Sequence, residues 1–87
     1  MKEITDLPNI GKVLAKKLAA VGITNEQYLG DAGSENAIIR LSILENNGVC
    51  RNMLYALEGA IQGIRWHDLS KEKKDNLRDF YNSTIKK

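Results

Sequence analysis

Residues that commonly anchor small folds or metal sites are scarce in this sequence. Its 87 residues include one cysteine, one histidine and one proline. A single cysteine excludes an internal disulfide, and neither Cys50 nor His67 has a second potential ligand nearby, so we expect no zinc site and no cofactor. We interpret Cys50 as a thiol buried in the core, because free cysteine is usually buried.

Long hydrophobic runs and a strong net charge are also missing. No stretch approaches the length of a membrane-spanning helix, and the segment Met1–Asp6 lacks the apolar core of a signal peptide. We therefore expect a protein of the cytoplasm with no membrane partner. The formal net charge of +2 is too small to indicate nucleic-acid binding by itself, so function has to be argued from where the charges lie.

Residue combinations typical of enzymes are missing too. No motif pairs Glu45, Glu58 or Asp68 as a general acid and base, and no Ser–His–Asp or Cys–His arrangement is present. We therefore predict that the protein is not an enzyme. Trp66 either stacks on an exposed base, as aromatic side chains do in single-strand binders, or fills the groove between the last two helices, which we prefer.

Apolar residues recur at helical spacing, whereas no segment shows the alternation of a strand. With 43% hydrophobic residues, seven glycines and one proline, the composition is that of one small globular domain over residues 1–87. We predict an all-α orthogonal bundle of five or six helices. The expected helices lie at about 2–6, at 10–21, around Tyr28 and Leu29, from 34 to 44, at 50–64 and at 71–85. Ser34 is the expected N-cap of the fourth helix, and Asn46-Asn47-Gly48 is expected to end it.

The clearest predicted helix is the one at 50–64, which we expect to be the central strut. Its apolar stripe consists of Cys50, Met53, Leu54, Leu57, Ile61 and Ile64. Gly59 lies in its interior, where glycine costs roughly 1 kcal/mol relative to alanine. Such a cost is tolerable where another backbone packs close, so we expect a helix crossing at Gly59.

A tight turn, residues 7–11, runs directly into the predicted helix 10–21. Pro8 fixes its own φ, and Asn9 is one of the few non-glycine residues that accept a left-handed conformation. Gly11 has no Cβ, so a ligand can approach its backbone closely. The first N–H groups of a helix have no intrahelical partner and lie at its positive end. The amides of Asn9, Ile10 and Gly11 thus form either a phosphate site or only a well-capped turn.

Three lysines follow this turn. Lys12 and Lys16 are four residues apart, so they lie one above the other on a helix face, flanked by Lys17. No acidic residue occurs between Asp6 and Glu26. The lysines either contact backbone phosphates or form a solvated face, and the adjacent turn raises the weight of the first interpretation.

The sequence Leu7-Pro8-Asn9-Ile10-Gly11, followed by Leu14-Ala15, Leu18 and Val21-Gly22-Ile23, resembles a helix-hairpin-helix motif. The resemblance implies that the hairpin amides hold nucleic-acid backbone phosphates, and it would allow a monovalent cation under the hairpin carbonyls. The usual hairpin has glycine at the position of Asn9 and often proline at that of Lys12. Only residues 1–6 are available for the first helix, which must be very short.

A second block extends the likeness over nearly the whole chain. Residues 52–63, with the core Leu-Tyr-Ala-Leu-Glu-Gly-Ala, and the following Trp66 and Leu69 resemble the C-terminal domain of the TfoX (Sxy) regulators of competence for DNA transformation. In full-length regulators this domain follows a separate N-terminal domain. The resemblance makes a regulatory protein, or a separate chain carrying that N-terminal domain, a candidate partner.

We favour a small module that binds the DNA backbone without sequence readout. The predicted contact residues are Asn9, Ile10, Gly11, Lys12, Lys16 and Lys17. The alternative is a protein-interaction domain that keeps the hairpin only as a structural turn and docks a transcription factor, a TfoX N-terminal domain or a second copy of itself. An apolar patch at Ile39 and Ile43 would favour this alternative.

Overall fold

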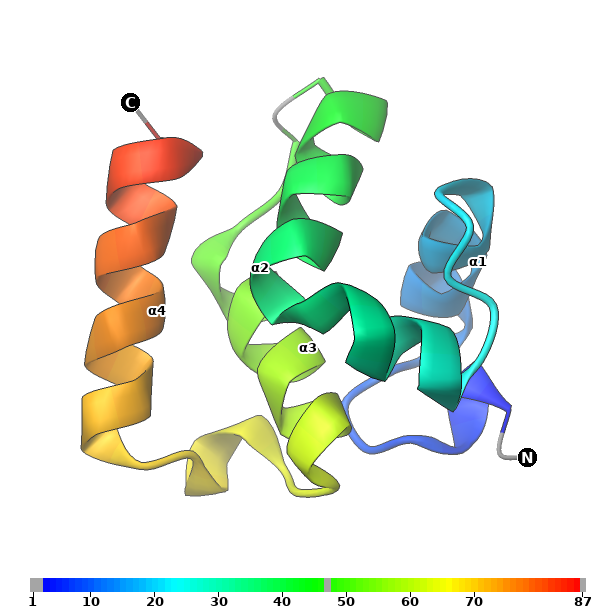
Figure 1. Ribbon diagram of the computed structural model, residues 1–87, viewed down its shortest axis with the longest axis horizontal. Coiled ribbons are helices and arrows are strands. Elements are labelled where there is room, and N and C mark those ends of the chain that lie inside the picture. Colours follow the sequence, from blue (N-terminus) through cyan, green and yellow to red (C-terminus); the bar gives the residue numbers. More distant parts are fainter. Residues whose placement is uncertain (1–2, 47, 87) are drawn as a thin grey trace.

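The computed structural model describes residues 3–46 and 48–86, so Lys2 and Asn47, which fall within predicted segments, lie outside the described residues. The described chain is all-α, as predicted (Figure 1). It has four α-helices and two short 3-10 helices rather than five or six helices. In chain order they are η1 (Ile4–Asp6), α1 (Lys12–Ala20), α2 (Glu26–Leu44), α3 (Arg51–Gln62), η2 (Trp66–Asp68) and α4 (Lys71–Thr84).

Two of the predicted helices are the two parts of α2, which a kink separates. We predicted a short helix at Tyr28 and a separate helix beginning at Ser34, whereas α2 includes both and bends at Gly33. Gly33 has φ 80° and ψ 160°, a conformation that glycine adopts easily and other residues rarely adopt. Figure 1 shows the two parts of α2 running in different directions. Gly33 therefore interrupts the helical conformation at one residue, and the chain changes direction there without an intervening loop.

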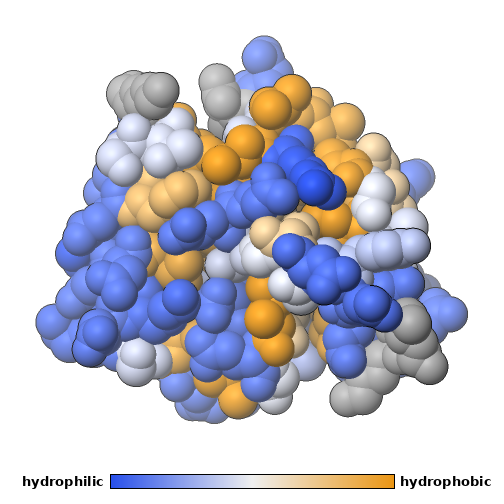
Figure 2. All heavy atoms as spheres, in the orientation of Figure 1, coloured by the Kyte–Doolittle hydropathy of each residue, from blue (hydrophilic) through white to orange (hydrophobic). Residues whose placement is uncertain are grey.

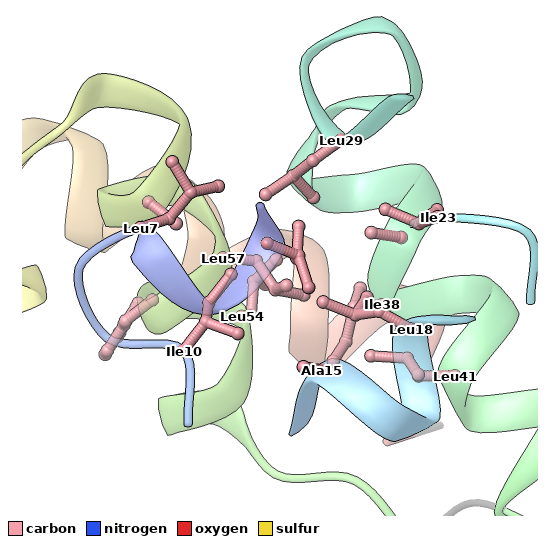
Figure 3. Packing of buried hydrophobic residues seen from close by; sticks show 14 of the residues in the cluster. Leu7, Ile10, Ala15, Leu18, Ile23, Leu29, Ile38, Leu41, Leu54 and Leu57 are labelled. Carbon is pink, nitrogen blue, oxygen red and sulfur yellow. The ribbon is translucent and has the colours of Figure 1, made fainter. Parts of the chain in front are cut away.

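The hydrophobic core lies where α1, α2 and α3 meet. Figure 3 shows side chains from the segment before α1 and from these three helices pointing toward one another. The largest side chains with almost no exposure are Leu18, Ile23, Leu29, Ile38, Leu41, Leu54, Leu57 and Leu77. Helix α3 packs against α2, η2 and α4, which confirms its prediction as the central strut.

Two tyrosine hydroxyls help attach α4 to the rest of the molecule. The Tyr81 hydroxyl donates to the Val49 carbonyl at 2.9 Å, and the Tyr55 hydroxyl donates to the Lys74 carbonyl at 3.4 Å. Leu77 supplies the buried apolar contact of α4. In Figure 1, α4 lies at one side of the molecule and α1 at the other. Charges on these two helices can therefore be altered separately.

A polar cluster joins the bend of α2 to α3. The Ser34 hydroxyl, in a residue only 5% exposed, donates to Glu58 Oε1 at 2.7 Å. Gln62 Nε2 donates to Glu58 Oε2 at 2.8 Å, and Lys73 Nζ of α4 lies 3.9 Å from the same oxygen. These contacts use the Glu58 carboxylate to hold three helices together, which is a structural role.

The prediction that Cys50 lies in the core is wrong, because the residue is exposed. Cys50 is the N-cap of α3, with φ −133° and ψ 165°. Since its backbone is extended, its side chain does not continue the helical stripe that begins with Met53. The apolar spacing was therefore extended one position too far toward the N-terminus.

Candidate nucleic-acid interface

The hairpin Leu7–Gly11 is anchored on the core by two apolar side chains. Leu7 and Ile10 are each 5% exposed, whereas Gly11 at the end of the hairpin is exposed. Asn9 has φ 71°, which confirms the left-handed conformation expected for this residue. The element before the hairpin is the single 3-10 turn η1, in agreement with the very short first helix that we expected.

The Asn9 side chain points into the protein and not toward a ligand. Its Nδ2 donates to the Ile64 carbonyl at 2.9 Å and to the Ala56 carbonyl at 3.3 Å. Its Oδ1 accepts from the Trp66 N–H at 3.1 Å. One side chain thus joins the hairpin to α3 and to the segment after it. We call this set of three hydrogen bonds the Asn9 clamp.

Gly59 makes room for the Asn9 clamp. A Cβ at position 59 would lie 2.5 Å from Asn9 Nδ2 and 2.8 Å from the Ile64 carbonyl oxygen. That carbonyl is brought back over Gly59 because α3 ends at the left-handed Gly63 and the Ile64 N–H donates to the Gly59 carbonyl at 2.9 Å. The close neighbours of Gly59 are therefore a side chain of the hairpin and the returning chain, instead of the crossing helix that we expected.

The start of α1 is open toward solvent. The first helical hydrogen bond runs from the Ala15 N–H to the Gly11 carbonyl at 3.0 Å, so the N–H groups of residues 12–14 precede it. Gly11 offers no side-chain cap, and the first turn of α1 contains no acidic residue. Nothing lies within 4 Å of a Cβ built on Gly11. The approach to the backbone at Gly11, the N-cap of α1, is therefore open to an anion.

The three predicted lysines do not behave alike. Lys12 and Lys16 are exposed beside the hairpin and, within the described part of the chain, form no ion pair. Lys17 is turned toward the end of α2, where its Nζ lies 2.9 Å from Glu45 Oε1. The structure thus leaves Lys12 and Lys16 as the cations at the start of α1 and partly neutralises Lys17.

An apolar groove of about 400 Å³ adjoins the same helix start. It is lined by Gly11, Lys12, Val13, Leu14, Lys17 and Met53. Val13 is 72% exposed, so most of its side chain is open to solvent at this groove. We call this feature the α1 groove.

The sequence matches the model of a known protein family. Residues 1–81 match the family model described as the TfoX C-terminal domain. The chain belongs to the TfoX C-terminal domain family. The resemblance that the hairpin and residues 52–63 suggested is therefore confirmed at the level of the family.

Similar proteins extend this family assignment. The DNA transformation protein TfoX of Haemophilus influenzae is 30% identical over 87 residues, which is the whole of this chain but 40% of that protein. An uncharacterized protein of Listeria monocytogenes, in a triclinic crystal form, is 46% identical with a TM-score of 0.91, and the match covers 94% of this chain and 92% of that one. A tetragonal form of a Listeria monocytogenes protein of unknown function is 48% identical with a TM-score of 0.88, over 92% and 96% of the two chains.

Two features of this TfoX C-terminal domain were missed by sequence reasoning. The α1 groove joins Met53 to residues 11–17, and the Asn9 clamp joins the hairpin to residues 56–66. Both depend on contacts between distant segments, so no local spacing predicts them. The match of both blocks to one family was the available signal that they form a single unit.

The aromatic side chains form a stack at the far end of α3. The Trp66 ring lies 5.9 Å from that of Tyr55 and 3.9 Å from that of His67, and Lys74 Nζ lies 5.9 Å from its centroid. Trp66 thus packs between α3 and the start of α4, as we preferred.

Residues 3–46 and 48–86 contain no group of three metal-ligating side chains. No described helix is long and apolar enough to cross a membrane.

Proposed function

We propose that this TfoX C-terminal domain binds DNA backbone phosphates, without sequence readout, at the start of α1. The observation that carries the proposal is the uncapped helix start at Gly11, flanked by the exposed Lys12 and Lys16. Backbone amides and the helix dipole attract phosphate there, and the lysines add charge. The name of the Haemophilus influenzae relative, a DNA transformation protein, supports a role in DNA transformation.

Such a site predicts weak binding that depends strongly on salt. Two or three phosphate contacts give a slope of log K against log salt of about −2 to −3, and Kd values of about 10⁻⁴ to 10⁻⁶ M. Phosphate contacts fix position without reading bases, so affinity should vary little with sequence. Because Lys17 is paired with Glu45, we expect the shallower slope of about −2.

An amide chemical-shift titration with a short DNA duplex tests this site. At about 50 mM salt we expect the largest shifts at residues 10–14 and 16. Binding should weaken markedly at about 200 mM salt, because releasing the same counterions into more concentrated salt is less favourable. A slope near zero, or a duplex and a single strand that both leave these amides unchanged, would overturn the proposed function.

A matched pair of charge variants tests the lysines. Lys12→Gln with Lys16→Gln should reduce the affinity for duplex by about 10-fold or more and lower the salt slope by about 2. Lys71→Gln with Lys86→Gln removes the same charge from α4 and its C-terminal end, on the other side of the molecule, and should change affinity far less. Equal losses in both variants would mean that only net charge matters.

The second candidate function, protein docking, is favoured by apolar side chains at the end of α2. Ile43 is 77% exposed and Leu44 47% exposed, while Ile39 is half-buried. Figure 2 shows hydrophobic atoms gathered over this end of α2. Exposed apolar patches often mark interaction sites. The partner would be a regulatory protein, a TfoX N-terminal domain or a second copy of this chain.

Self-association is the simplest form of docking to measure. If copies pair through this patch, sedimentation equilibrium between about 10 and 500 μM should show an apparent mass that rises with protein concentration. Ile43→Ser should weaken this pairing, because each copy then buries less apolar surface, by about two CH₂ groups. A monomer mass throughout would exclude self-association as the use of this patch.

A further inference from the structure

The α1 groove and the start of α1 share residues, so a single ligand can occupy both. Gly11 and Lys12 line the groove and also form the first residues at the open helix end. In a nucleotide the base and the phosphate are joined by one sugar, so the two groups lie next to each other. A phosphate at the amides of residues 12–14 can therefore have its own sugar and base within reach of the α1 groove.

We propose that the α1 groove binds the base of an unpaired nucleotide, so that the preferred ligand is single-stranded DNA or a DNA end or junction with an unpaired base. This inference rests on the proposed phosphate site. It adds the form of the DNA, because the bases of an intact duplex are stacked inside the helix and cannot enter a groove in the protein.

The lining of the groove suits a planar base. Val13, Leu14 and Met53 provide apolar contact, and the Met53 thioether is a favourable neighbour for an aromatic ring. Lys12 can approach the face of a base as well as a phosphate. Gly11 has no Cβ and an open approach, which lets the sugar lie against the backbone.

The two ends of the groove differ in charge, as the two ends of a nucleotide do. At the helix start, Lys12 and the amides form a positive region suited to phosphate. At the other end of the groove, the charge of Lys17 is opposed by Glu45 at 2.9 Å. This less charged end fits a neutral base better than it fits a second phosphate.

The test compares three DNA ligands by fluorescence anisotropy at about 50 mM salt. They are a strand of ten thymidines, the same sugar-phosphate strand with all bases removed, and a ten-base-pair duplex. We expect the thymidine strand to bind about 5- to 10-fold more tightly than the abasic strand. This ratio is at the lower end of the gain in affinity that contact between one base and a protein gives. It should also bind more tightly than the duplex, although the duplex has the higher charge density.

Two exposed apolar residues provide a matched pair of variants. Val13→Ser should weaken binding of the thymidine strand about 3-fold and leave binding of the abasic strand unchanged, since it removes apolar contact and no charge. Tyr28→Ser removes another exposed hydrophobic side chain, 52% exposed, that does not line the groove, and should change neither. Both sites are exposed, so both variants should fold.

The outcomes separate this inference from the proposed phosphate site. Equal binding of the thymidine and abasic strands, equal effects of the two variants, or tighter binding of the duplex would each overturn the inference while leaving the phosphate site in place. If none of the three ligands binds, the phosphate site and the inference fail together.

Discussion

Replacing Gly59 with alanine should lower the free energy of unfolding by about 3 kcal/mol. The new methyl group would lie 2.5 Å from Asn9 Nδ2, 2.8 Å from the Ile64 carbonyl oxygen and 3.1 Å from Trp66 Cα, two of which are backbone atoms. Overpacking costs about 1–3 kcal/mol, and displaced hydrogen bonds of the Asn9 clamp cost about 1 kcal/mol each. Better helix propensity returns about 1 kcal/mol.

Urea unfolding of Gly59→Ala, followed by circular dichroism, measures this loss. A chain of this length is expected to have a total stability of about 4–13 kcal/mol, so the change is large. Gly30→Ala is the matched control, because Gly30 also lies inside a helix but has nothing within 4 Å of the position that its new methyl group would take. That variant should gain about 0.5–1 kcal/mol. If the Gly59→Ala protein were as stable as the parent, the short distances from position 59 to Asn9 and Ile64 would be contradicted.

The second large effect is expected for Asn9→Gly, which should lose about 2–3 kcal/mol. Glycine accepts φ 71° without strain, so the variant removes the three hydrogen bonds of the Asn9 clamp and keeps the shape of the turn. Each bond contributes about 0.5–1.5 kcal/mol, and the Ile64 and Ala56 carbonyls lose a protein donor.

Asn46→Gly is the control for the backbone conformation. Asn46 also has a positive φ, 51°, but it is exposed at the end of α2. Its replacement should change stability by about 0.5 kcal/mol or less. Equal losses at positions 9 and 46 would mean that the conformation of asparagine, and not the Asn9 clamp, determines the effect.

The two substitutions should also be coupled. With glycine at position 9, Nδ2 is gone, so the methyl group of Gly59→Ala meets one obstacle fewer. The loss in the double variant should therefore be smaller than the sum of the single losses, as is usual for residues in direct contact. Strict additivity would show that Asn9 and Gly59 do not share a contact.

The sequence was a good guide wherever local chemistry decides the structure. The left-handed Asn9 and the stripe that makes α3 the central helix follow from residue types at short spacing. The break in α2 was predicted as well, because a helix ending near Gly33 and another beginning at Ser34 agree with the non-helical φ and ψ of Gly33. What the spacing did not predict is that the two parts follow each other without a loop. The start of α1 was predicted two residues too early, so the N–H groups that precede its first helical bond belong to residues 12–14 and not to residues 9–11.

The remaining features depend on contacts between distant parts of the chain. The direction of the Asn9 side chain is decided by the Ile64 and Ala56 carbonyls, about fifty residues away in sequence. The pairing of Lys17 with Glu45 and the exposure of Val13 beside Met53 also require the assembled fold. Residue spacing therefore placed the lysines on one helix, but it did not separate Lys17 from Lys12 and Lys16.

The Asn9 clamp also has a consequence for the speed and entropy of recognition. Because the hairpin is fixed to α3 before any ligand arrives, the start of α1 that follows it is already in place and no loop has to be ordered on binding. Binding then does not pay the conformational entropy of ordering a loop, so the modest affinity from each contact is not reduced further. Association should proceed in one kinetic phase, near the rate set by diffusion and charge, and differences between ligands should show mainly in how fast they leave.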